Sequence, residues 1–154
     1  NNSYLFFELQ KFDFSIRKQL NSPKKIYLID AAFNMIGGLN FSMNRGRILE
    51  NIVFIELKRR NKEVYYHSNN NECDFLIKEG TKIKKAIQVC YILSEDTKER
   101  EVNGLLEAMH KFKLKDGIIL TYEQEDELNI KGKKIIVMPV WKWLLMPTFK
   151  NRKV

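Results

Sequence analysis

Apolar residues recur at helical spacing in two long segments of the chain. The first covers residues 44–61, and its last turn is basic, which suits the C-terminal end of a helix. The second begins at Asp96, which we predict as the N-cap, with Glu99 three residues later as its capping-box partner. The apolar stripes are Ile48, Leu49, Ile52, Val53, Ile55 and Leu57 in the first segment, and Val102, Leu105, Leu106, Met109 and Phe112 in the second. We therefore predict two long helices, each with one buried face.

Strand-like segments lie between and after these helices. Three follow one another with turns at Asn69–Asn71 and Glu79–Gly80, a spacing that predicts an antiparallel meander. Two more follow the second helix, separated by an acidic turn at residues 123–127, before Pro139 opens a short final helix. The five segments are residues 63–67, 73–78, 83–93, 118–122 and 134–138. Because a helix separates the meander from the later strands, we predict an α/β fold with a helical crossover and a mixed sheet.

Shorter elements are predicted for the N-terminal part of the chain. Residues 4–14 are typical of a strand or a connector, and residues 15–20 of one or two helical turns. Residues 25–30 form a short apolar run of strand type. Asp30 is then predicted to cap a helix that stops at Gly37–Gly38.

Length and composition place the chain among folded single domains. It has 154 residues, of which 44% are hydrophobic, and this content is enough to bury one core. Lys and Arg number 27 against 19 Asp and Glu, which gives a formal charge of +8. Such a charge favours an anionic partner such as nucleic acid or an acidic protein surface, and the other interpretation is a solvated lysine-rich surface. No apolar run approaches the ~20 residues of a membrane span, so no membrane partner is expected.

The two cysteines, Cys73 and Cys90, point to a reducing compartment. They fall in neighbouring predicted strands without CxxC spacing, and the chain shows no signal-peptide pattern. We therefore expect a cytoplasmic protein. A zinc site has no matching ligand spacing, and nothing in the sequence places His67 or His110 beside Cys90 to make it a nucleophile.

The start of the chain suggests a piece of a longer polypeptide. The first residue is Asn rather than Met, and the opening segment is too apolar for a free tail. There is no GxxxxGK[ST] phosphate loop in the sequence. We therefore do not expect ATP to be bound by this part of the protein.

Three polar side chains fall at or near positions predicted to be buried. Glu50 lies on or beside the packing face of the first helix, Asp74 begins the second strand, and Gln88 lies in the middle of the third. If those strands form a hairpin beneath the helix, the three side-chain oxygens meet and could accept Mg²⁺, which could orient a phosphodiester and activate water. Structural roles are the other interpretation: a charge at a helix N-terminus, a turn cap and a sheet-edge amide pair, respectively.

The order of these residues resembles a known superfamily. Glu50, then Asp74 in CDF, then Gln88-x-Cys90 in IQVC resemble the PD-(D/E)XK, restriction-endonuclease-like pattern of a helical Glu, a strand Asp and a Glu-or-Gln-x-Lys on the next strand. The segments GRILENIVFIELKRRNKEVYYH, ECDFLIKEG, AIQVCYIL and VMPVWKWLL resemble the domain of unknown function that ends many archaeal and bacterial AAA-type ATPases. The resemblance covers roughly residues 25–146.

This resemblance implies a fold, a partner and a site. The fold is a restriction-endonuclease-like mixed sheet flanked by helices, the partner is DNA, and an ATPase module with a winged-helix segment precedes the domain. It divides the chain into a connector at residues 1–24, the nuclease-like domain at 25–146 and a tail at 147–154. It gives Glu50, Asp74 and Gln88 the catalytic and metal-binding positions, with Cys90 in the position of the lysine. Because the missing ammonium would stabilise charge on the phosphorane, we expect nuclease activity to be weak or lost.

Five basic residues are candidates for contacts with DNA. They are Lys58, Arg59, Arg60, Lys84 and Lys85. Lys58, Lys78 or Lys84 could also supply the missing ammonium, while an ordinary solvated charge is the other interpretation of each. The competing function for the whole domain is a non-catalytic module that docks partner proteins or assembles the ATPase.

Overall fold

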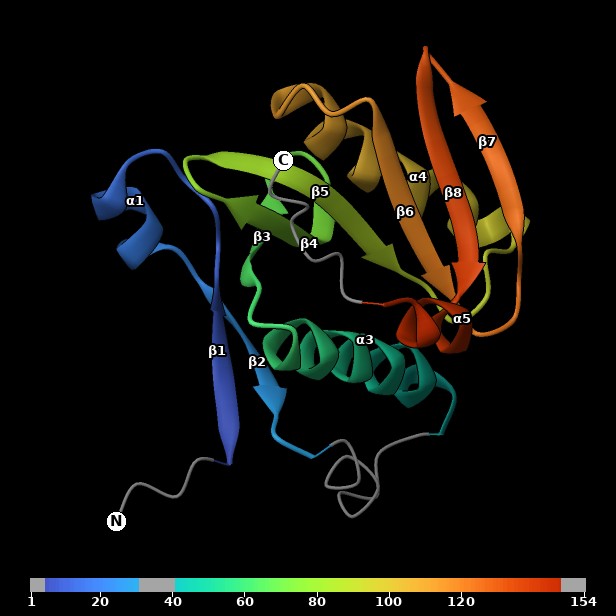
Figure 1. Ribbon diagram of the computed structural model, residues 1–154, viewed down its shortest axis with the longest axis horizontal. Coiled ribbons are helices and arrows are strands. Elements are labelled where there is room, and N and C mark those ends of the chain that lie inside the picture. The colour runs from blue at the N-terminus through green and yellow to red at the C-terminus, as the bar shows by residue number, and fades with distance from the viewer. Residues whose placement is uncertain (1–4, 31–40, 148–154) are drawn as a thin grey trace.

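Six strands form the central sheet of the molecule. In the computed structural model, which describes residues 5–30 and 41–147, their order is β3-β4-β5-β6-β8-β7 (Figure 1). Their bounds are β3 Glu63–Ser68, β4 Glu72–Glu79, β5 Lys82–Val89, β6 Asp116–Thr121, β7 Asp126–Ile130 and β8 Lys133–Pro139. Strands β3, β4 and β5 are antiparallel neighbours, whereas β6 is parallel to β5 and β8 is parallel to β6. The predicted mixed sheet with a meander and a crossover is therefore confirmed.

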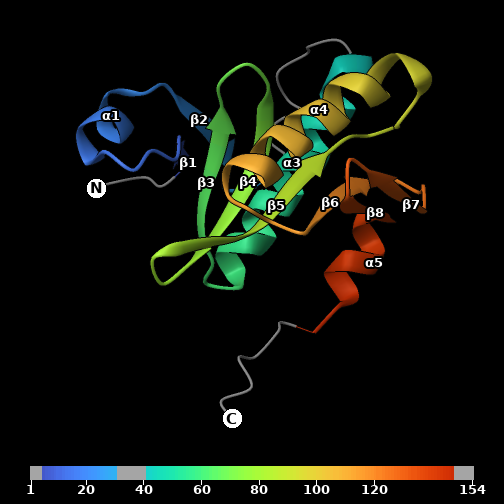
Figure 2. The same ribbon diagram turned by 90° about the horizontal axis from the view of Figure 1, so that it is seen from above.

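Helices cover both faces of this sheet. Helices α3 (Phe41–Arg59) and α5 (Val140–Leu145) lie on one face, and the crossover helix α4 (Glu95–Lys111) lies on the other (Figure 1 and Figure 2). The core therefore has two halves. The half beneath α4 includes Leu76, Leu105, Met109 and Ile119, and the half beneath α3 includes Val53, Phe54, Phe75 and Ile87. Because the sheet is buried on both faces, its central strands are apolar at nearly every position.

The start of α4 differs from the prediction. Its N-cap is Ser94 rather than Asp96, and the backbone N–H of Ser94 donates to Oγ1 of Thr97 at 3.0 Å. The capping box thus uses Thr97, and Glu99 has no part in it. Starting the helix earlier places Glu95 and Asp96 in its first turn, where a negative charge is favourable to the helix dipole.

Strand β5 ends earlier than the apolar run that predicted it. The run continues to Leu93, but the strand ends at Val89, and the last residue pair between β4 and β5 is Phe75 with Ile87. Beyond that pair the two strands separate, and the backbone N–H of Val89 donates to Oδ2 of Asp74 at 2.9 Å. The apolar residues that follow therefore lie in the loop that leads into α4. Side chains, rather than backbone hydrogen bonds, fill the space between the ends of β4 and β5.

Strand β7 was not predicted. Its residues were assigned in part to an acidic turn, yet Asp126–Ile130 pairs antiparallel with β8. The connection runs through Lys131 and Gly132, whose φ angles are 51° and 73°. Because β7 is an edge strand with mostly exposed residues, it lacks the apolar alternation by which a half-buried strand is recognised.

A smaller two-stranded sheet precedes the main one. Strand β1 (Phe6–Gln10) pairs antiparallel with β2 (Lys24–Leu28), and α1 (Ile16–Asn21) lies between them. The helical turns expected there and the strand at residues 25–30 are thus confirmed within a few residues. The ring of Tyr27 stacks on Phe54 of α3 at 4.2 Å between centroids, and this contact holds β2 against the helix.

The helix predicted after Asp30 falls on residues outside those that the structure describes. Among the helices of the described part, none is both long enough and apolar enough to span a membrane.

Candidate functional site

A polar cleft lies where α3, β4, β5 and α4 meet. Its volume is about 680 Å³, and its lining includes Arg47 and Glu50 from α3, Asp74 from β4, Gln88 from β5 and Arg100 from α4. A second hollow of about 410 Å³ lies beside it, next to β2, and shares Arg47, Glu50 and Glu72 with it. The cleft follows from the separation of β4 and β5, since side chains rather than a backbone ladder fill the space between the strand ends.

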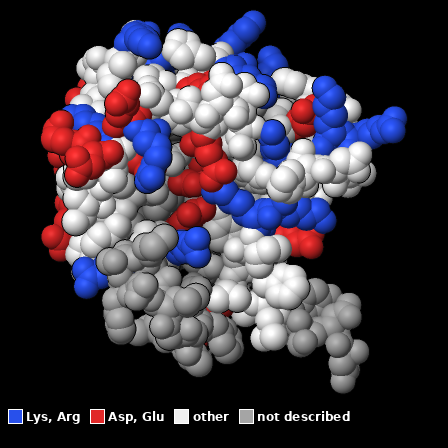
Figure 3. Space-filling view, turned by 180° about the vertical axis from the view of Figure 1, so that it is seen from behind, with Lys and Arg blue, Asp and Glu red and all other residues white. Residues whose placement is uncertain are grey.

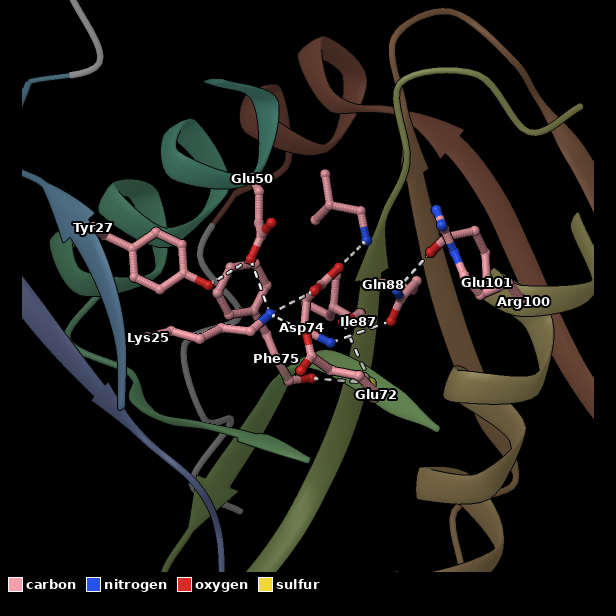
Figure 4. Close-up of polar contacts among 12 residues, drawn as sticks. Lys25, Tyr27, Glu50, Glu72, Asp74, Phe75, Ile87, Gln88, Arg100 and Glu101 are labelled. Atoms are coloured by element: carbon pink, nitrogen blue, oxygen red, sulfur yellow. Dashed lines mark hydrogen bonds and ion pairs between the residues drawn. The ribbon is translucent and has the colours of Figure 1, made fainter. Parts of the chain in front are cut away.

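One ammonium group lies at the centre of this site. The Nζ atom of Lys25 is 3.2 Å from Oε1 of Glu50, 2.7 Å from Oε1 of Glu72 and 2.9 Å from Oδ1 of Asp74 (Figure 4). Its side chain is 21% exposed. The three carboxylates favour the charged form and raise the pKa of Lys25, against the opposing and largest effect of burial. Lys25 therefore remains a cation held by three carboxylates that come from two elements.

The carboxylate of Glu50 has a second partner on β2. The hydroxyl of Tyr27 donates to Oε1 of Glu50 at 2.6 Å. Burial first, and then the charge of Glu50, raise the pKa of Tyr27 well above its usual value, so the hydroxyl keeps its proton. Since Lys25 and Tyr27 are two residues apart on one strand, both side chains point to the same side, and β2 supplies both donors to Glu50.

Asp74 is the most buried carboxylate of the group. One oxygen contacts Lys25, and the other accepts the backbone N–H of Val89. Burial, followed by the nearby charge of Glu50, raises the pKa of the Asp74 carboxyl to about 7. Lys25 and the Val89 N–H act in the opposite direction. A carboxylate so placed depends on Lys25 to remain charged at neutral pH.

Gln88 connects this group to α4. Its Oε1 accepts the backbone N–H of Asp74 at 3.2 Å, and its Nε2 donates to Oε2 of Glu101 at 2.6 Å. Glu101 is buried, and its other oxygen pairs with the exposed guanidinium of Arg100 at 2.5 Å. The polar residues thus form a continuous chain of contacts from β2 to α4, which Figure 4 shows from Tyr27 on one side to Arg100 on the other.

The three residues named from the sequence are brought close, but in two different ways. Glu50 and Asp74 converge on one cation. The amide of Gln88 faces the Asp74 backbone and Glu101 instead, so its oxygen does not join the two carboxylates. In this arrangement the ammonium of Lys25 contacts both carboxylates that were expected to bind Mg²⁺, and the described residues include no cluster of three or more His, Cys, Asp or Glu side chains that fits a metal ion.

Cys90 is among the residues that line the cleft, on the α4 side of the sheet. It is buried and belongs to the core beneath α4, and its Sγ contacts the carbonyl oxygen of Ile92 at 2.9 Å. Burial raises the pKa of the Cys90 thiol, with the charge of Glu101 adding to the effect. The thiol is therefore protonated and unsuited to nucleophilic attack. A lysine at this position would meet Glu101.

The predicted basic residues lie outside the cleft. Arg60 and Lys85 border a separate, largely apolar pocket of about 450 Å³ near α5. Arg60 is mostly buried, pairs with Glu56 at 2.6 Å, and donates to the carbonyl oxygens of Trp143 and Leu144. Its guanidinium thus holds α5 against α3. Lys58, Arg59 and Lys84 are exposed, and Arg59 pairs with Glu56.

Among the residues of the site that were not found from the sequence are Lys25, Tyr27, Arg47, Glu72, Arg100 and Glu101. Glu101 had a signal, because it precedes Leu105 and Ala108 by one and two helical turns on the buried face of α4. Lys25 had none, since a lysine at the start of a strand is usually solvated. Gly104 explains the position of Glu72: a β-carbon at Gly104 would collide with the carbonyl oxygen of Glu72, so the glycine lets β4 approach α4.

Comparisons with known proteins identify the family to which the chain belongs, but they give no activity. The chain is 40% identical over 157 residues to the uncharacterized protein MJ1544 of Methanocaldococcus jannaschii, a match that covers 94% of the chain and 34% of that relative. It is 27% identical over 141 residues to an uncharacterized protein of Haemophilus influenzae, which covers 91% of the chain and again 34% of the relative. The chain thus spans about a third of the length of these relatives. No solved structure matches it. Residues 45–143, which contain Glu50, Asp74 and Gln88, match the model of a domain of unknown function, and the chain belongs to this family, DUF4143.

Proposed function

We propose that this domain binds nucleic acid in the cleft, as a nuclease-like module in which the ammonium of Lys25 replaces a divalent cation. The observation that carries the proposal is the contact of this one partly buried ammonium with the carboxylates of Glu50 and Asp74, at 3.2 and 2.9 Å. A helical Glu and a strand Asp that converge on a cation are the arrangement that the PD-(D/E)XK resemblance implies. Lys25 supplies the positive charge without any metal.

Arginines around the cleft support a polyanionic ligand. Each acidic residue already has a cationic partner, since Glu50, Glu72 and Asp74 share the single ammonium of Lys25 and Glu101 pairs with Arg100. Arg47 is exposed, lines both hollows and has the reach of a long side chain toward a phosphate. Figure 3 shows one face on which acidic side chains gather at the centre, with Lys and Arg on either side. A phosphate backbone would therefore contact the arginines at the rim rather than one continuous basic surface.

The same geometry argues against efficient cleavage. For Mg²⁺ to bind, Lys25 would have to leave both carboxylates, and the Gln88 oxygen would have to leave the backbone N–H of Asp74. Cys90 supplies no cation. We therefore propose that wild-type protein with Mg²⁺ or Mn²⁺ leaves DNA intact over a time in which an active nuclease would cut it. Cleavage that disappears in Asp74→Asn would count against this proposal.

A salt titration tests the binding. Fluorescence anisotropy with labelled DNA should give a log affinity that falls linearly with log salt concentration, because bound phosphates release counterions. Arg47→Gln should weaken binding and reduce the magnitude of the slope by about one. Lys58→Gln and Lys84→Gln serve as matched controls, since they remove exposed lysines away from the cleft, and both should keep the wild-type slope. If the controls weaken binding and Arg47→Gln does not, DNA lies elsewhere on the domain.

The domain is also proposed to work within an AAA-type ATPase, as the sequence resemblance implies. The relatives, of which the chain spans 34%, contain enough further sequence for such a module. A non-catalytic role in assembly is the second candidate function. It is favoured by exposed apolar side chains on the small N-terminal sheet, on α1 and in the bend that precedes α1, namely Phe6, Phe14, Ile16, Leu20 and Ile26. If DNA binding fails, replacing Ile16 and Leu20 by Ser in the full-length protein should disrupt its assembly.

A further inference from the structure

Two tyrosines form a stacked pair at one end of the cleft. The ring centroids of Tyr91 and Tyr122 are 4.8 Å apart, with 22° between the ring planes. Tyr91 follows β5 and Tyr122 follows β6, and the backbone N–H of Tyr122 donates to the carbonyl oxygen of Tyr91 at 3.2 Å. Since the backbones at the ends of two paired strands hold them, the rings are positioned before any ligand arrives.

The outer member of this pair is open to solvent. Tyr122 is 48% exposed, whereas Tyr91 is partly buried and packs against the core beneath α3. Tyr91 also lines the cleft, together with Ile92, which is 56% exposed. The stacked pair therefore runs from the wall of the cleft outward to the surface, where half of the Tyr122 side chain is available for contact.

Arginines lie close to the stacked pair. The guanidinium of Arg45 is over the ring of Tyr91, 5.5 Å from its centroid, and Arg47 and Arg100 line the same cleft. Four acidic residues follow Tyr122 in the chain, namely Glu123, Glu125, Asp126 and Glu127. Two of them have a lysine partner: Glu125 pairs with Lys142 at 2.7 Å and Glu127 with Lys134 at 2.8 Å. Phosphates would therefore lie beside these arginines, and the stacked tyrosines would lie next to the phosphates.

From this juxtaposition we propose that Tyr122 is a stacking site for an unpaired nucleobase, so that the cleft takes single-stranded nucleic acid or a duplex with a single-stranded end. This inference rests on the proposed function and names its substrate class. An unpaired base offers its flat face to an aromatic ring, whereas a base inside a duplex is covered by its neighbours. Because every base has such a face, the site should not select a sequence.

Affinity measurements with Tyr122→Ala test the inference, and Tyr122→Phe, which keeps the ring, is the matched control. With a labelled oligothymidine strand, Tyr122→Ala should weaken binding about tenfold and leave the salt slope unchanged, while Tyr122→Phe should bind like wild type. With blunt duplex DNA the alanine variant should bind like wild type. An abasic strand of equal length should bind wild type and Tyr122→Ala equally, because it keeps the phosphates and lacks the bases.

The other outcomes separate the two proposals. If wild-type protein binds DNA, Arg47→Gln weakens it, and Tyr122→Ala changes nothing, the stacking site is overturned and the cleft remains. If Tyr122→Ala weakens binding of single-stranded, duplex and abasic DNA to the same extent, its role is structural and the inference is likewise overturned. If wild-type protein binds none of these probes at low salt, the proposed function and the stacking site fail together.

Discussion

The ammonium of Lys25 lies 2.9 Å from Oδ1 of Asp74, a carboxylate that the fold buries almost completely. The two residues are 49 positions apart in the chain, and they meet because Tyr27 anchors β2 against α3. Burial and the neighbouring Glu50 favour the protonated form of Asp74, while Lys25 favours the charged form. The charge state of the site thus depends on one lysine.

Replacing Lys25 by Met should destabilise the protein by about 3 kcal/mol or more, because it leaves the partly buried carboxylates of Glu50 and Asp74 facing each other without a cation. Urea unfolding would measure the change. Lys24→Met is the matched control: Lys24 is the preceding residue and pairs with Glu8, but both side chains are more than a third exposed. Lys24→Met should lower the free energy of unfolding by less than about 1 kcal/mol. Equal losses for the two variants would mean that Lys25 has no special role.

Replacing Gln88 by Glu should also destabilise the protein, by about 1–3 kcal/mol at neutral pH. The new carboxylate cannot donate to Glu101, whose Oε2 lies 2.6 Å from Nε2 of Gln88, and the two charges would repel each other. Adding Glu101→Gln should recover most of the loss, because its amide can donate to the new carboxylate. Chemical unfolding of the two single variants and the double variant would measure the coupling, and additive losses would contradict the contact.

His67 should make a contribution to stability that is lost on mild acidification; its sign is opposite to that of Asp74, whose raised pKa favours the folded state as the pH falls through 7. Its imidazole is buried, and its Nε2 lies 2.8 Å from Oε1 of Glu107. Burial lowers the pKa of His67 below its usual 6.5, although Glu107 raises it, while Lys11 and Lys111 add to the lowering. The unfolded chain therefore binds a proton more readily than the folded one. The contribution of His67 to stability is full above pH 6.5 and is lost as the pH falls from there through its lowered pKa.

Unfolding in urea across pH 5 to 8 would measure this dependence. His67→Gln keeps a polar group facing Glu107 but cannot titrate, so as the pH falls below 6.5 its free energy of unfolding should rise relative to that of wild type. His110→Gln is the control, since His110 is exposed on the same helix that carries Glu107. It should leave the slope as in wild type. A stability difference between His67→Gln and wild type that is the same at every pH would contradict the role of His67.

The sequence predicted the central architecture because the relevant signals were local. The helical stripe around Val53, the meander of β3 to β5 and the crossover through α4 all follow from apolar period and turn residues. Strand β7 was not predicted, because an exposed edge strand lacks the alternation of apolar and polar residues. The end of β5 was misplaced because the N–H of Val89 bonds to the side chain of Asp74, a tertiary contact that no periodicity reports.

The candidate site shows the same division. Glu50, Asp74 and Gln88 could be named because each falls at or near a position predicted to be buried. Their order along the chain also carries the resemblance to the PD-(D/E)XK pattern. Lys25 could not be named, because its position depends on how β2 packs against α3. The amide of Gln88 turns toward Glu101, which depends on the close approach of α4 to β4 at Gly104. Residues that act through contacts between elements are therefore the ones that pattern alone misses.

The most direct test of this account is the affinity of the wild-type domain for single-stranded DNA in EDTA. If Lys25 supplies the cation of the site, binding needs no metal, and removing every divalent ion should leave the affinity at low salt undiminished. The DNA should remain intact when Mg²⁺ is added back. Binding that is absent in EDTA, appears with Mg²⁺ and is lost in Asp74→Asn would contradict the account, because it would show that a metal ion, and not Lys25, occupies the site when DNA binds.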